Sequence, residues 1–269
     1  MSRLWIKHQG WLTRGQALLS SSAAFARAPA TRAQAPVDNT SETAVLKLQQ
    51  MLSEAPRGSL KFDTLDLYLG APWVRYAVIP WQDKLKRDSD WENYARVAMA
   101  QVYGIGTDNW RVRVAEAGWG KPRLAAAVDQ GMYQTLCELA RSQKFSLQRV
   151  EPLLTTAINR YKGQLRQREF VLVHLDEDQA VCAFWRDRAW RGVITLATQP
   201  DQLKKDSAAL GALVRDAAVL ASDFLPEQIY LVANSSRFAR MELDEFDLQW
   251  LGPIHADLMR RADDATHAA

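Results

Sequence analysis

The spacing of apolar and polar positions changes several times along the chain and predicts an order of elements. Between residues 170 and 232, three short apolar runs separated by polar turns precede a helical stripe and a last apolar run, which predicts the order β-β-β-α-β. The run 170–175 is apolar almost throughout, so we expect a central strand that is covered on both faces. The helix, at 201–222, is expected to bury Leu203, Leu210, Leu213, Val214, Ala217 and Leu220.

The first 80 residues predict a similar succession of strands, a helix and further strands. Residues 1–37 contain five basic residues and no acidic one, which favours one or two strands around a turn at Gly10, with a targeting peptide as the alternative. A helix follows near residues 40–53, where the apolar stripe consists of Val45, Leu48, Met51 and Leu52. A hairpin around Gly70 is expected to join the runs 64–70 and 73–81.

Alternating helical and strand patterns predict an α/β segment between these two regions. A helix within residues 88–104, ended by Gly104, is expected to place Trp91, Tyr94, Val97, Ala98 and Val102 on one side. Two strands, near 110–118 and 122–129, are followed by a helix at 129–143 with Met132, Leu136, Leu139 and Ala140 inward. The segment 145–162 begins as a strand and becomes a helix around Pro152.

The composition is that of an ordinary globular protein and narrows the function only slightly. The 269 residues are 48% hydrophobic and 24% charged, and the net charge of +3 is too small to indicate nucleic-acid binding by itself. No run of about 18 uncharged apolar residues predicts a membrane-spanning helix. We therefore expect neither a nucleic-acid partner nor direct membrane insertion.

Metal-binding and nucleophile motifs are missing from the sequence. Cys137 and Cys182 are far apart and form no CxxC pair, and the four histidines are scattered without an HxxxH pair. The sequence also has no P-loop, GxGxxG fingerprint or Ser-His-Asp set. We expect buried thiols, no metal, no cofactor and no catalytic residue.

The order of elements, and above all the stretch from residue 74 to 161, resembles the cytoplasmic actin-like assembly proteins of type IV pilus and type II secretion platforms, the PilM and GspL-like group. In that family a strand ending in proline leads into a small inserted subdomain and then back to the main sheet. The positions that match this passage are Pro80, Val128, Leu136, Leu139, Val150, Glu151, Pro152, Ala157 and Arg160.

The resemblance implies an α/β, actin-like (ribonuclease H-like) fold of two lobes, with two β-β-β-α-β units and a small inserted α/β subdomain. The expected boundaries are 1–78 for the first lobe, 79–148 for the subdomain and 149–269 for the second lobe. It also implies a non-enzymatic cytoplasmic scaffold, recruited to the inner membrane by the cytoplasmic tail of a bitopic subunit. A secretion or pilus ATPase is a further candidate partner.

Relatives that bind ATP hold phosphate with two hairpins that contain Asp, Gly and a hydroxyl residue, and here both hairpins depart from that pattern. The later hairpin has Asp176, Glu177 and Asp178 without glycine, and the earlier one, around Gly10, has neither Asp nor hydroxyl. These departures argue against nucleotide binding. The alternative is a divergent ATPase or nuclease whose site is built from Asp66, Asp176 and Asp178.

The arm from residue 73 to 81 is the candidate partner-binding site. It supplies Trp73, Arg75, Tyr76 and Trp81, and aromatic and arginine side chains are the usual anchors at protein interfaces. An ordinary core strand with two tryptophans at its ends accounts for the same pattern, so both interpretations stay open.

Overall fold

The computed structural model describes residues 2–9, 12–19, 41–55, 63–104, 109–176, 178–198 and 207–254. The chain divides into two compact units, each assembled from separate stretches of sequence. The first unit comprises residues 1–75, 109–111 and 128–153, and the second comprises the remaining residues, including 154–269. The expected boundaries, 1–78, 79–148 and 149–269, stay a prediction.

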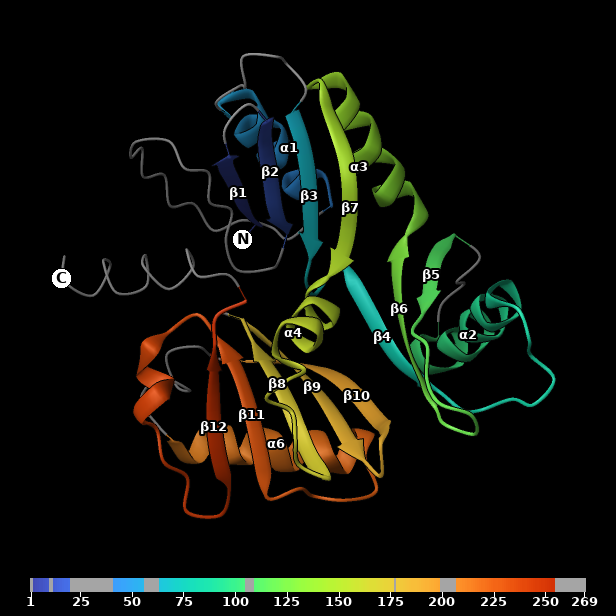
Figure 1. Cartoon of the computed structure of the whole chain (residues 1–269), viewed down its shortest axis with the longest axis vertical. Helices are drawn as coiled ribbons and strands as arrows, with labels where there is room; N and C mark the ends of the chain where they lie inside the picture. Colours follow the sequence, from blue (N-terminus) through green and yellow to red (C-terminus); the bar gives the residue numbers. More distant parts are fainter. Residues whose placement is uncertain are drawn as a thin grey trace. The chain divides into compact units, whose positions relative to one another are not determined.

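A four-stranded sheet forms the centre of the first unit (Figure 1). Its strands, in the order β1-β2-β3-β7, are Ser2–Gln9, Leu12–Leu19, Asp63–Leu69 and Phe145–Pro152. β1 and β2 are antiparallel, with Gln9 opposite Leu12, and β2, β3 and β7 are mutually parallel. The expectation of strands in the first 37 residues is therefore confirmed for β1 and β2.

Two helices pack on this sheet. α1 (Ser41–Ser53) contacts β1 and α3 (Gln130–Ser142), and α3 contacts β7. The expected stripes are inside, with Leu48, Leu52 and Leu136 completely buried. Two described strands precede α1 instead of the expected three, and residues 20–40, where a third would lie, are outside the described residues.

The second unit contains a five-stranded sheet in the order β10-β9-β8-β11-β12. The strands are β8 (Glu169–Leu175), β9 (Gln179–Arg186), β10 (Ala189–Ala197), β11 (Gln228–Ala233) and β12 (Asp247–Gly252). The hairpins β8-β9 and β9-β10 are antiparallel, whereas β11 runs parallel to both β8 and β12. With helix α6 (Ser207–Ala221) between β10 and β11, this is the expected β-β-β-α-β unit.

β8 is the middle strand and is covered on both faces, as its apolar run predicts. Val171 and Val173 belong to a core cluster with Val214 and other residues of α6, and both are completely buried. The residues of the opposite face, Phe170, Leu172 and His174, are buried as well.

Three apolar residues that were expected in helix interiors are exposed, namely Leu220 in α6 and Val97 and Val102 in α2. In α6 the buried residues centre on Val214, and Leu220 lies about 120° from that direction and is 65% exposed.

Gly192 of β10 lies so close to the end of α6 that an added Cβ would come 1.5 Å from the carbonyl oxygen of Ala221, which fixes how the helix faces the sheet.

In α2 (Asp88–Tyr103) the residues inside are Trp91, Ala95 and Met99. Val97 lies about 160° from the centre of this stripe, and Val102 lies in the last turn, so that both are exposed instead of buried. The helix ends at Gly104, whose φ of 64° is readily adopted by glycine.

A three-stranded sheet and α2 form the inserted subdomain (Figure 1). The strands, in the order β4-β6-β5, are Val74–Ile79, Arg123–Asp129 and Trp110–Val114. From β7 the chain enters α4 (Leu153–Tyr161) directly after Pro152, as predicted. No helix in the described part of the chain is long and apolar enough to cross a membrane.

Candidate functional site

The four candidate anchors lie along β4, but the strand separates them. Trp73 ends the turn before the strand, and its backbone N–H donates to the carbonyl of Gly70 at 2.9 Å. Arg75 is exposed, with its guanidinium 5.8 Å from the ring centroid of Trp110. Trp81 follows the other end of the strand, so about 26 Å of extended chain separates Trp73 from Trp81. The two tryptophans therefore do not form one compact site.

Tyr76 lies below the surface and not on it. The residue is 2% exposed, and its hydroxyl accepts a hydrogen bond from the backbone N–H of Leu154 at 3.3 Å. Burial raises the pKa of this hydroxyl. The hydroxyl of Tyr103 accepts from the N–H of Tyr76 at 3.2 Å and donates to its carbonyl at 2.6 Å. Through these hydrogen bonds Tyr76 of β4 is tied to Leu154 of α4 and to Tyr103 of α2, and all three residues belong to the second unit.

Trp81 is part of an aromatic group that we call the tryptophan platform, consisting of Trp81, Trp91, Trp119 and Arg123. The ring centroids of Trp81 and Trp119 are 4.8 Å apart in an edge-on arrangement, and those of Trp81 and Trp91 are 5.4 Å apart. Trp91 is buried in α2, whereas Trp119, in the loop between β5 and β6, is 81% exposed. The platform therefore presents a large apolar ring on a supported base.

Arg123, at the start of β6, holds the platform together. Its guanidinium lies 4.2 Å from the ring centroid of Trp91 and 5.7 Å from that of Trp81. A planar cation over an indole is attracted by the ring's quadrupole and fills the space between the rings. The indole N–H of Trp81 donates to Asp83 at 2.5 Å, which fixes that ring's orientation.

Sequence reasoning found Trp81 but missed the other three members of the platform. Trp91 was predicted as a core residue of its helix, which is correct, but its ring is also the base on which Arg123 rests. Trp119 lies between Gly118 and Gly120. A large aromatic flanked by glycines in a turn was the signal that could have identified it.

The three aspartates of the alternative site belong to different units of the chain. Asp66 is completely buried in β3 of the first unit, while Asp176 and Asp178 lie in the β8-β9 turn of the second. Among the described residues, no three or more His, Cys, Asp or Glu side chains are grouped so that they could hold a metal ion.

The β8-β9 turn is closed by its own backbone, since the N–H of Asp176 donates to the carbonyl of Gln179 at 2.8 Å. Two carboxylates flank this turn on either side of Glu177, which lies outside the described residues, as does the β1-β2 turn at Gly10. A hairpin of this composition offers negative charge where a phosphate group would need N–H donors.

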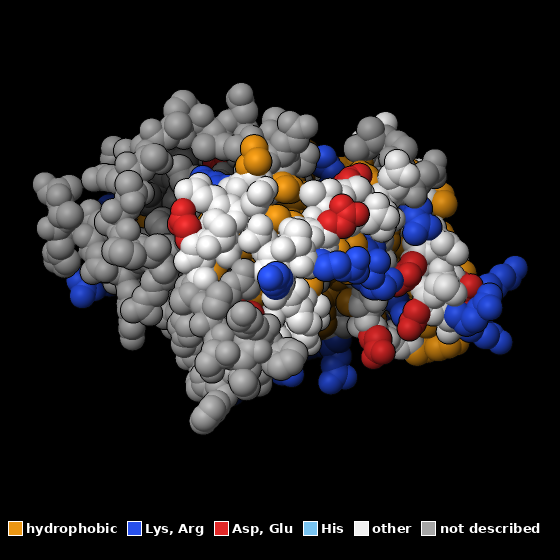
Figure 2. Space-filling view, turned by 90° about the horizontal axis from the view of Figure 1, so that it is seen from above, with side chains coloured by type: hydrophobic (Ala, Val, Ile, Leu, Met, Phe, Trp, Pro, Cys, Tyr) orange, Lys and Arg blue, Asp and Glu red, His pale blue; other side chains and the backbone are white. Residues whose placement is uncertain are grey.

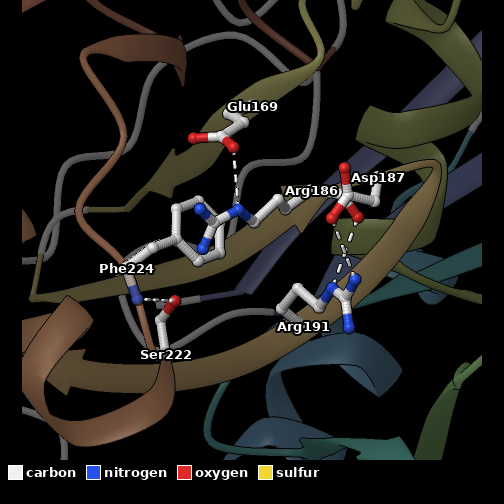
Figure 3. Close-up of polar contacts among 6 residues, drawn as sticks. All are labelled: Glu169, Arg186, Asp187, Arg191, Ser222 and Phe224. Carbon is white, nitrogen blue, oxygen red and sulfur yellow. Dashed lines mark hydrogen bonds and ion pairs between the residues drawn. The ribbon is translucent and has the colours of Figure 1, made fainter.

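A second group of charged side chains lies at the β9-β10 hairpin and is satisfied internally (Figure 3). Arg186 donates to Glu169 at 2.7 Å and covers the ring of Phe224 at 4.7 Å from its centroid. Arg191 pairs with Asp187 at 3.3 Å, beside the turn. Because these charges contact one another, we assign the group to the structure of the hairpin.

No protein-family model and no curated protein matches the chain. Among solved structures, the chain is similar to the cytoplasmic domain of EpsL, an inner membrane component of the type II secretion system of Vibrio cholerae. The sequences are 12% identical, the TM-score is 0.50, and the match covers 82% of this chain and 80% of that one. The fold is actin-like. The resemblance to PilM and GspL-like proteins noted from the sequence therefore extends to the fold.

Two further structures match less well. The PilM–PilN type IV pilus biogenesis complex has 14% identity and a TM-score of 0.47, covering 86% of this chain and 77% of that one. A Bacteroides thetaiotaomicron protein with an actin-like ATPase fold and unknown function has 11% identity and a TM-score of 0.46, covering 71% and 67%.

Proposed function

We propose that this chain is a non-catalytic scaffold in the assembly of a type IV pilus or type II secretion-like machine. It would act on the cytoplasmic side of the inner membrane, recruited by the cytoplasmic tail of a membrane subunit. The observation that carries the proposal is the fold it shares, over 82% of its length, with the cytoplasmic domain of an inner membrane secretion component. The machine's ATPase is a second candidate partner.

The composition of the β8-β9 turn supports the non-catalytic part of the proposal. A nucleotide site in this fold needs glycine and hydroxyl residues at the hairpins, and Asp176 and Asp178 provide neither. ATP with magnesium at millimolar concentration should therefore leave the melting temperature unchanged, whereas a ligand at a hundred times its Kd would stabilise by about 2.7 kcal/mol. A rise of several degrees that disappears in Asp66→Asn or Asp176→Asn would establish the ATPase or nuclease alternative instead.

The tail of the membrane subunit would dock along β4. A flexible peptide loses chain entropy on binding, so the surface has to offer a few strong anchors rather than a large area. Arg75 is exposed in the middle of the arm, with Trp73 at one end and Trp81 at the other. Tyr76 supports the strand from below and makes no direct contact in this proposal.

Capture from detergent-solubilised inner membrane tests the docking. The full chain, used as bait, should retain a bitopic protein, and truncation of one anchor should weaken retention about thirtyfold, which corresponds to the roughly 2 kcal/mol of an interface hot spot. The variants are Trp73→Ala, Arg75→Ala and Trp81→Ala, and Arg141→Ala, an exposed arginine of α3, is the matched control. Equal capture by all four variants would contradict the proposed surface, and capture of nucleic acid alone would contradict the scaffold function.

A further inference from the structure

The tryptophan platform brings together two loops that are distant in sequence, residues 80–87 and 115–122. Trp81 belongs to the first loop and Trp119 to the second, and their edge-on contact at 4.8 Å joins the loops. Trp119 projects from this base with 81% of its surface exposed. Because Trp81 already restricts the Trp119 ring, little side-chain entropy would be lost when Trp119 binds a partner.

The same loops carry a surplus of positive charge. Residues 80–87 and 115–122 contain four Lys and Arg side chains and two Asp and Glu, a surplus of two in a chain whose net charge is +3. Arg87 is paired with Asp90 at 3.1 Å, whereas Lys84 and Lys86 are exposed, and neither has an ion pair among the described residues. Figure 2 shows Lys and Arg side chains gathered at the right-hand end, beside hydrophobic and acidic ones.

We propose that this surface contacts an anionic lipid bilayer, with Trp119 at the level of the headgroups and Lys84 and Lys86 on the lipid phosphates. Tryptophan is the side chain that favours the membrane interface, since its ring is apolar and its N–H needs a polar partner. Lysines of the loop that carries Trp81 can extend their ammonium groups to an anionic surface on their long apolar stems.

Each such contact is weak alone and becomes effective when a second one holds the protein at the membrane. A single tryptophan and two or three lysines give reversible binding, comparable to one signal of a two-signal anchor. A chain already retained by a membrane subunit has an effective local concentration in the millimolar range, at which the lipid contact would be populated. The lipid contact would then orient the scaffold, which goes beyond recruitment by a tail.

Sedimentation of the full chain with vesicles tests this surface without any protein partner. We expect binding to vesicles containing 30% phosphatidylglycerol, little binding to pure phosphatidylcholine, and loss of binding at 0.5 M salt. Each lysine contributes about fivefold, so Lys84→Gln with Lys86→Gln should weaken binding by about twentyfold or more. Trp119→Ala should weaken it further while the far-ultraviolet circular dichroism stays unchanged.

The matched controls are Lys162→Gln, an exposed lysine outside the loops, and Val219→Ala, which is 84% exposed on α6. Both controls should bind as the unchanged protein does. Failure to sediment with anionic vesicles, or equal binding by all variants, overturns the proposal. If Trp119→Ala instead reduces only the capture of a bitopic protein in detergent, the platform is a protein-binding surface and the scaffold proposal stands without the lipid contact.

Discussion

Two aromatic clusters in the second unit have nearly the same ring spacing but differ in how far they reach into solvent. In the tryptophan platform the centroids of Trp81 and Trp119 are 4.8 Å apart. In a cluster on the five-stranded sheet, consisting of Phe170, Trp185, Trp190 and Tyr230, those of Trp185 and Trp190 are 4.9 Å apart. Phe170 and Tyr230 are each 2% exposed, whereas Trp119 is 81% exposed. Ring-to-ring contact therefore does not tell a core from a binding surface, and the surroundings decide.

The size of the sheet beneath each cluster explains the difference. Phe170 lies on the middle strand of five, with ordered strands on both sides, and the hydroxyl of Tyr230 accepts the backbone N–H of Arg166 at 3.4 Å. The platform lies at the end of a three-stranded sheet, where Trp91 is buried on the inner side of α2 and Trp119 is not covered. A sheet of three strands is too small to cover all the aromatic side chains around it, so part of the aromatic surface stays exposed to solvent.

The largest effect is expected from substitutions in β8, the central strand of the sheet that carries Phe170. Val173→Asp, or Val171→Asp, places a carboxylate in a completely buried site of the central strand and should unfold the second lobe. Circular dichroism and limited proteolysis would detect this. Wild-type thermal stability in either variant would mean that β8 is not a central strand.

Truncating one ring from each cluster compares them directly. Phe170→Ala should lower the free energy of unfolding by about 3–5 kcal/mol, because a buried ring is lost and a cavity remains. Trp119→Ala should change it by less than about 0.5 kcal/mol, as is usual for exposed positions. Urea denaturation measures the free energy of unfolding of both variants. A similar loss in the two would contradict the assignment of Phe170 to the core and of Trp119 to the surface.

The third prediction uses a histidine on the same face of the sheet as the buried cluster. His174 is two and four residues along β8 from Leu172 and Phe170, and burial lowers its pKa, although the charge of Asp176 opposes the shift. The neutral form is favoured in the folded state, so the unfolded state binds more protons as the pH falls. Stability is fully present above about pH 6.5, the ordinary pKa of histidine, and declines below it.

Between the ordinary pKa and the lowered one, the loss from His174 approaches about 1.4 kcal/mol per pH unit. In His174→Gln, the free energy of unfolding should therefore fall less between pH 6.5 and pH 5 than in the unchanged protein. Urea titrations at both pH values test this, and an unchanged slope in the variant would assign the pH dependence to other groups.

The smallest effect concerns the base of the platform. Arg123→Lys keeps the charge but loses the planar contact with Trp91, so stability should fall by about 1 kcal/mol. Arg141→Lys, an exposed arginine of α3, is the control and should have no measurable effect. Thermal unfolding compares the two.

Sequence patterns predicted the elements well where one rule was sufficient and failed where tertiary packing decided. The strand at 170–175 and the stripe of α3 follow from periodicity and are confirmed. Leu220 and Val97 were predicted inside their helices but are exposed. The sequence does not show which side of a helix will pack on the sheet, so an apolar residue near the edge of the stripe can be assigned to the wrong side. The third strand of the first lobe stays a prediction.

The candidate site was harder to predict for the same reason. Trp81, Trp119 and Arg123 come from two loops and a strand that meet only in the folded chain, so no local spacing connects them. Tyr76 is either a candidate anchor or a core residue of its strand by sequence; the residue is buried, and its hydroxyl accepts the N–H of Leu154 in α4.

The hydroxyl of Tyr103 has a consequence for how other chains can approach. β4 is an outer strand of its sheet, and outer strands offer free backbone groups on which a foreign strand can assemble. At Tyr76 both backbone groups are already taken by one phenol oxygen, at 3.2 and 2.6 Å. An incoming segment therefore finds the middle of this edge closed and cannot extend the sheet by main-chain pairing there. Whatever docks on this arm must be recognised through its side chains, which restricts the choice of partner and also protects the protein from edge-to-edge aggregation.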